Sequence, residues 1–208
     1  LAKRLDKINA VSALESNISC PNTTSPVAQW SSGCLPAGQA GKPLISQDPR
    51  ATFDLVKAVR RATSKTLITK LSPNVTDITE IALAAEKAGC DALALINTVQ
   101  GMSVDVRMRR PKIAMGVGGL SGPAIRPIAV RMVWELYQKV KIPIIGMGGI
   151  VDTESALEFF IAGATAISVG TANFVNPGVS VEIAEGIKKY LEENNIKNIE
   201  ALKGSIKV

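Results

Sequence analysis

The chain has 208 residues and a net charge of +6, and 46% of its residues are hydrophobic while only 4% are aromatic. It contains no histidine, which excludes serine–histidine triads, cysteine–histidine dyads and most catalytic zinc sites. The basic residues are scattered, and no apolar run reaches the ~20 residues of a membrane span. We therefore expect a cytoplasmic protein with no nucleic-acid partner and no membrane partner.

Five short runs that are almost continuously apolar predict β-strands buried on both faces. They lie at residues 13–18, 66–69, 92–96, 142–145 and 166–169. Helical patterns are expected at residues 1–8, 77–89, 123–140, 152–161 and 180–193. Asp77 and Asp152 are the expected N-caps of two of these helices, and Gly163 follows the C-terminal end of the second. This alternation of strands and helices indicates a parallel sheet.

Polar residues and glycines follow the carboxyl end of every predicted strand. In chain order they are Asn17 with Cys20, Lys70, Asn97 with Thr98, Gly148 with Gly149, and Gly170 with Thr171. Delivery of such residues to one face is typical of a barrel, whereas a doubly wound sheet would carry one early Gly-x-Gly-x-x-Gly turn. We therefore expect an α/β fold that is the C-terminal portion of a TIM (β/α)8 barrel. It would hold about five of the eight strand-helix units, in a single domain over residues 1–208.

Cys20 lies just past a strand end and precedes Pro21. A thiolate whose pKa is slightly lowered can accept a proton near neutral pH, and no histidine competes for that role. The alternative is that Cys20 is a small buried apolar residue, which is the interpretation we give to Cys34 and Cys90.

Lys70 ends a strand inside an apolar run, where an ammonium group needs an anionic partner unless its side chain reaches solvent. Asn17, Asn97 and Thr98 offer neutral donors and acceptors, although each of them alone is also a common turn or cap residue. Their shared position at strand ends favours a binding role.

Glycines follow the last two strands and precede one helix, at Gly148-Gly149, Gly170-Thr171 and Gly122. Barrels commonly bind a phosphate group on backbone N–H groups at the first two of these places, because a Cβ atom would block close approach of the ligand. Ordinary turn glycines are the alternative for each position taken singly.

Six motifs in order resemble those of the NAD-linked (type 1B) dihydroorotate dehydrogenase catalytic subunits. They are Asn-Ile-Ser-Cys-Pro-Asn (17–22), Lys-Leu-Ser-Pro-Asn-Val-Thr-Asp-Ile (70–78), Ile-Asn-Thr-Val-Gln-Gly-Met (96–102), Gly-Gly-Leu-Ser-Gly-Pro-Ala-Ile-Arg-Pro-Ile-Ala (118–129), Ile-Ile-Gly-Met-Gly-Gly-Ile (144–150) and Val-Gly-Thr-Ala-Asn-Phe (169–174). The resemblance covers nearly the whole chain except about residues 23–47.

The resemblance implies oxidation of (S)-dihydroorotate to orotate in de novo pyrimidine biosynthesis, with hydride transfer to FMN. It implies electron transfer to NAD through a partner subunit that carries FAD and a [2Fe–2S] cluster, in a heterotetramer. It places the base at Cys20, substrate contacts at Asn17, Asn22, Asn97 and Thr98, and flavin contacts at Asn17, Lys70 and Ile96. The FMN phosphate would lie at Gly148, Gly149, Gly170 and Thr171, and Gly122 would be a further cofactor-binding glycine.

Two features set this chain apart from the family pattern. The expected barrel lacks about three N-terminal strand-helix units, and residues 23–47 form a loop that is longer than usual and divergent in sequence. The alternatives are a flavoenzyme domain similar to dihydropyrimidine dehydrogenase and a non-catalytic remnant that binds flavin or phosphate. Asn22 and the Gly-Gly-Leu-Ser-Gly-Pro turn favour dihydroorotate as the substrate.

Overall fold

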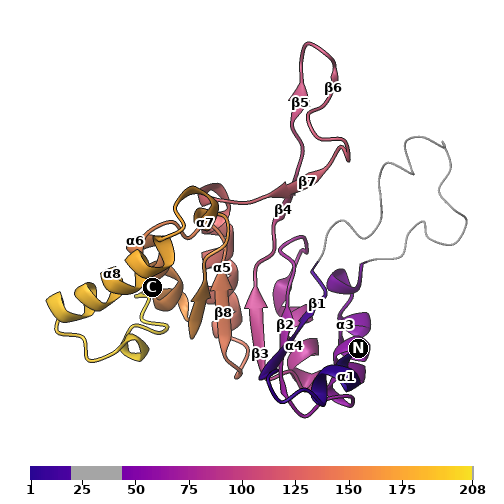
Figure 1. The fold of residues 1–208 in the computed structure, drawn as a ribbon, viewed down its shortest axis with the longest axis horizontal. Helices are drawn as coiled ribbons and strands as arrows, with labels where there is room; N and C mark the ends of the chain where they lie inside the picture. Colours follow the sequence, from indigo (N-terminus) through magenta and orange to yellow (C-terminus); the bar gives the residue numbers. More distant parts are fainter. Residues whose placement is uncertain (20–43, 208) are drawn as a thin grey trace, which may run out of the picture.

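The computed structural model of the chain describes residues 1–19 and 44–207, so the predictions for Cys20, Asn22, Cys34 and most of the segment 23–47 fall outside this part. Five parallel strands form its main sheet (Figure 1). They are β1 (Ala13–Asn17), β2 (Thr66–Lys70), β3 (Ala92–Leu95), β8 (Ile144–Met147) and β9 (Ala166–Ser168). The five predicted strands are thereby confirmed, although β8 begins two residues later than expected, after Pro143. The expected burial on both faces is wrong for β1 and β9, which are the edge strands of this sheet and are largely exposed.

The strands lie side by side in the same order in which they follow one another along the chain, β1-β2-β3-β8-β9. A doubly wound sheet would reverse its order at a switch point, whereas consecutive parallel neighbours are the arrangement of a (β/α)8 barrel. The register places Asn17 beside Lys70 and Lys70 beside Ala94, so the carboxyl ends of the first three strands are level with one another. The predicted C-terminal portion of a TIM barrel is confirmed.

The helices pack on one another in the same consecutive order as the strands. They are α1 (Ala2–Asp6), α3 (Pro49–Arg60), α4 (Ile78–Ala88), α5 (Arg126–Tyr137), α6 (Thr153–Ala162), α7 (Ala172–Val175) and α8 (Val179–Glu193), with short 3-10 turns at Ile45–Gln47, Pro123–Ile125 and Ile199–Ala201. Helix α3 contacts α4, α4 contacts α5, α5 contacts α6, and α6 contacts α8. The sheet and its helices therefore wind in one direction, as in a barrel wall.

Helix α3 was absent from the predicted elements, although its sequence carries a start signal. Asp48 accepts hydrogen bonds from the N–H groups of Arg50 and Ala51, and Pro49 occupies the first turn. The predicted caps of α4 and α6 are confirmed: Asp77 accepts from the N–H of Thr79, and Asp152 accepts from that of Ser155.

The core lies between the sheet and its helices. Leu67, Leu93 and Ile144 of three neighbouring strands are fully or almost fully buried, and Phe159 of α6 has no exposed surface. Burial raises the pKa of the Cys90 thiol to about 11. Cys90 is therefore a neutral packing residue at neutral pH, as the sequence predicted.

Residues 99–120 form an arm that projects away from the sheet (Figure 1). At its base β4 (Val99–Gly101) pairs with β7 (Gly118–Leu120), and toward its tip β5 (Val104–Asp105) pairs with β6 (Arg110–Pro111), both in antiparallel orientation. Its strands are only two or three residues long. Such short strands show no periodicity in the sequence, and the arm was not predicted.

Candidate functional site

A cavity of about 600 Å³ lies at the carboxyl ends of the strands. This volume is within the usual range for small-molecule and cofactor sites. Ten of the residues predicted for the site belong to the described part of the chain, and nine of them line the cavity. The nine are Lys70, Ile96, Asn97, Thr98, Gly122, Gly148, Gly149, Gly170 and Thr171. The structure thus gathers residues that lie as much as 101 positions apart in the sequence, from Lys70 to Thr171.

Asn17 is the predicted residue that does not line the cavity, and it reaches the cavity wall through Ser19. Asn17 Oδ1 accepts hydrogen bonds from the backbone N–H (3.2 Å) and the hydroxyl (2.8 Å) of Ser19. Asn97 Nδ2 in turn donates to the carbonyl and the hydroxyl oxygen of Ser19, both at 2.9 Å. Ser19 is fully buried and links β1 to β3. Sequence reasoning did not single it out, although it stands inside the first motif.

Lys70 presents the positive charge of the cavity. It ends β2, is half-buried, and has no carboxylate oxygen within 4.0 Å among residues 1–19 and 44–207. An ammonium group at the edge of an apolar core without a protein counter-charge is available to neutralise an anionic ligand. The prediction that Lys70 faces a ligand space is consistent with this placement.

Two glycine turns meet at the cavity, and both have backbone conformations that favour glycine. Gly149 has φ +76°, and a Cβ atom added there would lie 2.8 Å from the carbonyl oxygen of Gly122 and 2.8 Å from Arg126 Cβ. Gly122 combines φ +86° with ψ −170°, a region essentially reserved for glycine. The turn after β8 therefore packs directly against the turn before α5.

At Gly122 and Gly170, unlike at Gly149, the space that a Cβ atom would occupy is open. A Cβ atom added to Gly170 or to Gly122 would meet no protein atom within 4 Å. Backbone groups there are accessible from the cavity, which suits a ligand that approaches the main chain closely, such as a phosphate group. The donor set and the open glycine surfaces fit a phosphate-bearing cofactor.

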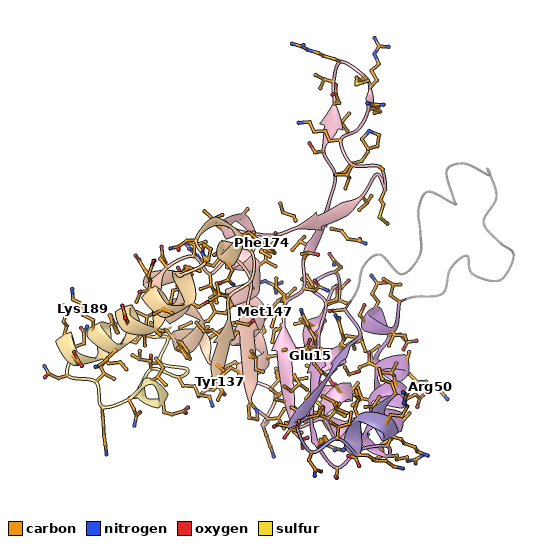
Figure 2. All side chains as sticks on the ribbon, viewed as in Figure 1. Glu15, Arg50, Tyr137, Met147, Phe174 and Lys189 are labelled. Atoms are coloured by element: carbon orange, nitrogen blue, oxygen red, sulfur yellow. The ribbon has the colours of Figure 1, made fainter. Side chains whose placement is uncertain are left out.

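The rest of the wall is mostly apolar and was not predicted. It comprises Ser121, Pro123, Ile125, Met147, Ile150, Val151, Ser168, Ala172, Val175, Asn176 and Val179. Figure 2 labels Met147 at the end of β8 and the largely exposed Phe174 on α7. The wall residues lie at strand ends, in the loops that follow them and at the ends of helices, but the sequence does not reveal which residues of these segments face the cavity. Apolar walls with a few polar groups suit a large aromatic ring that has polar edges.

Asp152 lies next to this wall, at the start of α6. The hydrogen bond from the backbone N–H of Ser155 to the Asp152 carboxylate holds the pKa of that carboxyl below its usual value. Ser155 in turn donates to the backbone carbonyl of Asp152 and accepts from the N–H of Val151. This capping arrangement fixes the residues that follow Gly149.

Within the part of the chain that the structure describes, no group of three or more His, Cys, Asp or Glu residues could hold a metal ion. None of the described helices is long and apolar enough to cross a membrane.

Comparison with known proteins identifies relatives along nearly the whole chain. The family model described as "Dihydroorotate dehydrogenase" matches residues 1–191. The "Dihydroorotate dehydrogenase B (NAD(+)), catalytic subunit" of Trichlorobacter lovleyi is 52% identical over 206 residues, which are 99% of this chain and 63% of that protein. The protein of the same name from Caldicellulosiruptor bescii is 50% identical over 95% of this chain and 61% of its own length.

A solved structure has the same fold. The crystal structure of dihydroorotate dehydrogenase from Eimeria tenella in complex with ferulenol aligns with a TM-score of 0.73 and 21% sequence identity, over 98% of this chain and 56% of that one. The chain therefore spans less than two thirds of the length of the relatives that it matches.

Proposed function

The chain belongs to the dihydroorotate dehydrogenase family, and on that premise we propose that it contributes most of the active site of an enzyme that oxidises (S)-dihydroorotate to orotate with FMN. One observation carries the proposal. Three kinds of group converge on one cavity: the ammonium of Lys70, which has no carboxylate within 4.0 Å among the described residues, the neutral side chains of Asn97 and Thr98, and two glycine turns. Each of these elements matches one part of the two ligands.

The cofactor would be held by its phosphate and by its ring. Backbone N–H groups at Gly148-Gly149 and Gly170-Thr171 would bind the phosphate, with Gly122 beside them. Ile96 would lie against the isoalloxazine ring, and Asn17 would contact its polar edge. When bound, FMN would accept a hydride from C6 of the substrate at its N5 atom. The ammonium of Lys70 would stabilise the negative charge that reduction adds near N1 and O2.

The substrate would be held by neutral amide and hydroxyl groups. Asn97, Thr98, Asn17 and Asn22 would bind the ring edges and the carboxylate of dihydroorotate. The thiolate of Cys20 would take the proton from C5 while the hydride leaves C6, so that a C5–C6 double bond forms. Cys20 and Asn22 lie outside the described residues, and their roles rest on the first motif.

We also propose that electrons leave through a second subunit. The relatives from Trichlorobacter lovleyi and Caldicellulosiruptor bescii are named catalytic subunits and NAD(+)-linked, which implies a partner in those proteins. The three cysteines of this chain are fewer than the four that commonly bind an iron–sulfur cluster. A partner with FAD and a [2Fe–2S] cluster, in a heterotetramer, would supply the route to NAD.

The visible spectrum of the purified chain with FMN, recorded before and after anaerobic addition of dihydroorotate, tests the proposal. Bound flavin that loses its absorbance on addition of dihydroorotate is the expected result. Bleaching by dihydrouracil but not by dihydroorotate would indicate the dihydropyrimidine dehydrogenase alternative. Flavin that binds without bleaching, or does not bind, would contradict an active site within this chain and would leave the remnant alternative.

A further inference from the structure

Asn74 lies in the loop between β2 and α4, outside the cavity wall, and its side chain joins two segments of the site. Asn74 Nδ2 donates to the carbonyl oxygen of Thr98 (3.1 Å), and Asn74 Oδ1 accepts from the backbone N–H of Gln100 (2.9 Å). A carbonyl can only accept and an N–H can only donate, so these two partners determine the orientation of the amide. Asn74 is thus a two-point contact to the chain between β3 and β4.

This contact takes the place of a neighbouring strand. Gln100 pairs with Gly119 of β7 on one edge of β4, and Asn74 occupies the other edge. The side chain of Thr98 is packed against Gly119 so tightly that a Cβ atom there would overlap it. The segment that carries Asn97 and Thr98 is therefore held from two sides, by an amide and by a glycine. Backbone polar groups at such a strand exit need partners of this kind.

Asn74 is itself anchored to the rest of the sheet end. Its backbone N–H donates to the hydroxyl oxygen of Ser72 (3.2 Å), and its carbonyl accepts a hydrogen bond from Gln47 Nε2 (3.0 Å). Ser72 is buried. Because its own loop is held at both points, Asn74 can fix the β3–β4 segment rather than merely follow it.

We propose that Asn74 is a positioning residue for substrate binding: it holds Asn97 and Thr98 in the orientation in which they face the cavity. The inference rests on the proposed function in one respect, namely that these two residues bind the substrate rather than the flavin phosphate. Asn74 does not line the cavity, so its loss would act through the β3–β4 segment. Asn74 is not among the nearest neighbours of Gly148 and Gly149, which come from Ile96, Gly122, Ile125, Arg126 and Ala129, so we expect these turns to keep their contacts without it.

The substitution Asn74→Asp tests this role with a minimal change of shape. The carboxylate keeps the acceptor for Gln100 but loses the donor to Thr98 and sets an oxygen against its carbonyl. We expect the affinity for orotate, measured by the change in the visible spectrum of bound flavin, to fall about tenfold. The affinity for FMN, measured by quenching of its fluorescence, should change less than about twofold.

Asn194→Asp is the matched control. Asn194 Nδ2 donates to the carbonyl of Tyr190 at the end of α8 (2.9 Å), so the same chemical change occurs away from the cavity. It should leave both affinities unchanged. Orotate affinity that is unaffected by Asn74→Asp, or an equal loss of FMN and orotate affinity, would overturn the proposed role.

Hydrogen exchange separates a failure of this inference from a failure of the proposed function. In Asn74→Ala, the N–H of Gln100 loses its acceptor, and faster exchange confined to residues 98–101 is expected. If the flavin spectrum of the unsubstituted chain shows no response to orotate, the proposed function fails. The exchange rates at residues 98–101 then still test whether Asn74 holds the β3–β4 segment. Exchange at residues 98–101 that equals that of the unsubstituted chain would overturn the inference in either case.

Discussion

The cavity end of the sheet and the arm of residues 99–120 both depend on glycines and short turns, but they differ in what surrounds these residues. At the cavity, Gly149 is enclosed by the backbone of Gly122 and by Arg126. In the arm, Gly116 has almost the same φ, +77° against +76°, and nothing lies within 4 Å of an added Cβ atom. The comparison separates the cost of backbone conformation from the cost of close packing, and substitutions in the two regions can measure each.

The largest effect is expected for Gly149→Ala. The alanine must adopt a positive φ and must also push away the carbonyl of Gly122, so we expect a loss of about 3 kcal/mol in unfolding free energy together with weaker FMN binding. Gly116→Ala is the matched control, and it should lose only about 1 kcal/mol from the backbone term. Urea denaturation of both variants gives the two values. Equal losses would show that packing around Gly149 contributes nothing.

A smaller effect is expected at the base of the arm, where the two regions meet. Gly119→Ala would force the methyl group into the side chain of Thr98, and it should lower stability by about 2 kcal/mol and weaken orotate binding. The control is Gly101→Ala on the paired strand, where the added Cβ atom would make an ordinary contact of 3.7 Å with Leu120. A Gly119 variant that binds orotate normally would contradict the tight packing of Thr98.

Two aspartates make the same kind of cap in the two regions. Asp152 accepts from the N–H of Ser155 at the cavity, and Asp105 accepts from those of Arg107 and Met108 near the tip of the arm. Asp152→Ala should cost about 1 kcal/mol at pH 7. Asp105→Ala should cost less in global unfolding, because an exposed arm can open locally while the core stays folded.

The loss of unfolding free energy caused by Asp152→Ala should also depend on pH. The folded-state pKa of Asp152 is below the 3.8 of an unperturbed carboxyl, so its stabilisation is fully present above pH 3.8 and is lost as the pH falls through the folded-state value. Melting curves of the parent and of Asp152→Ala should therefore converge at the acid end. A deficit of equal size at pH 7 and well below pH 3.8 would contradict the role of the ionised carboxylate.

The same contrast explains what the sequence could predict. The barrel strands are short, mostly apolar runs, and Lys70, Asn97 and Gly148 follow three of them, so the strands and nine of the residues that line the cavity were predictable. The arm was not, because strands of two or three residues leave no pattern. Ser19 and Asn74 were missed for another reason. They act through contacts to distant backbone groups, which appear only when the strand ends are placed side by side.

The smallest effect is expected for the exposed apolar residues of the arm. Val106 is 83% exposed, so Val106→Ala removes little apolar surface from the folded core and should change the unfolding free energy by less than about 0.5 kcal/mol. Val133→Ala on α5, where the side chain is fully buried, is the control and should lose several times more. Urea denaturation at two protein concentrations measures both. A loss above about 1 kcal/mol in Val106→Ala that grows with protein concentration would show that another copy of the chain covers this side chain in solution. In a monomer the exposed Val106 has almost no contacts to lose.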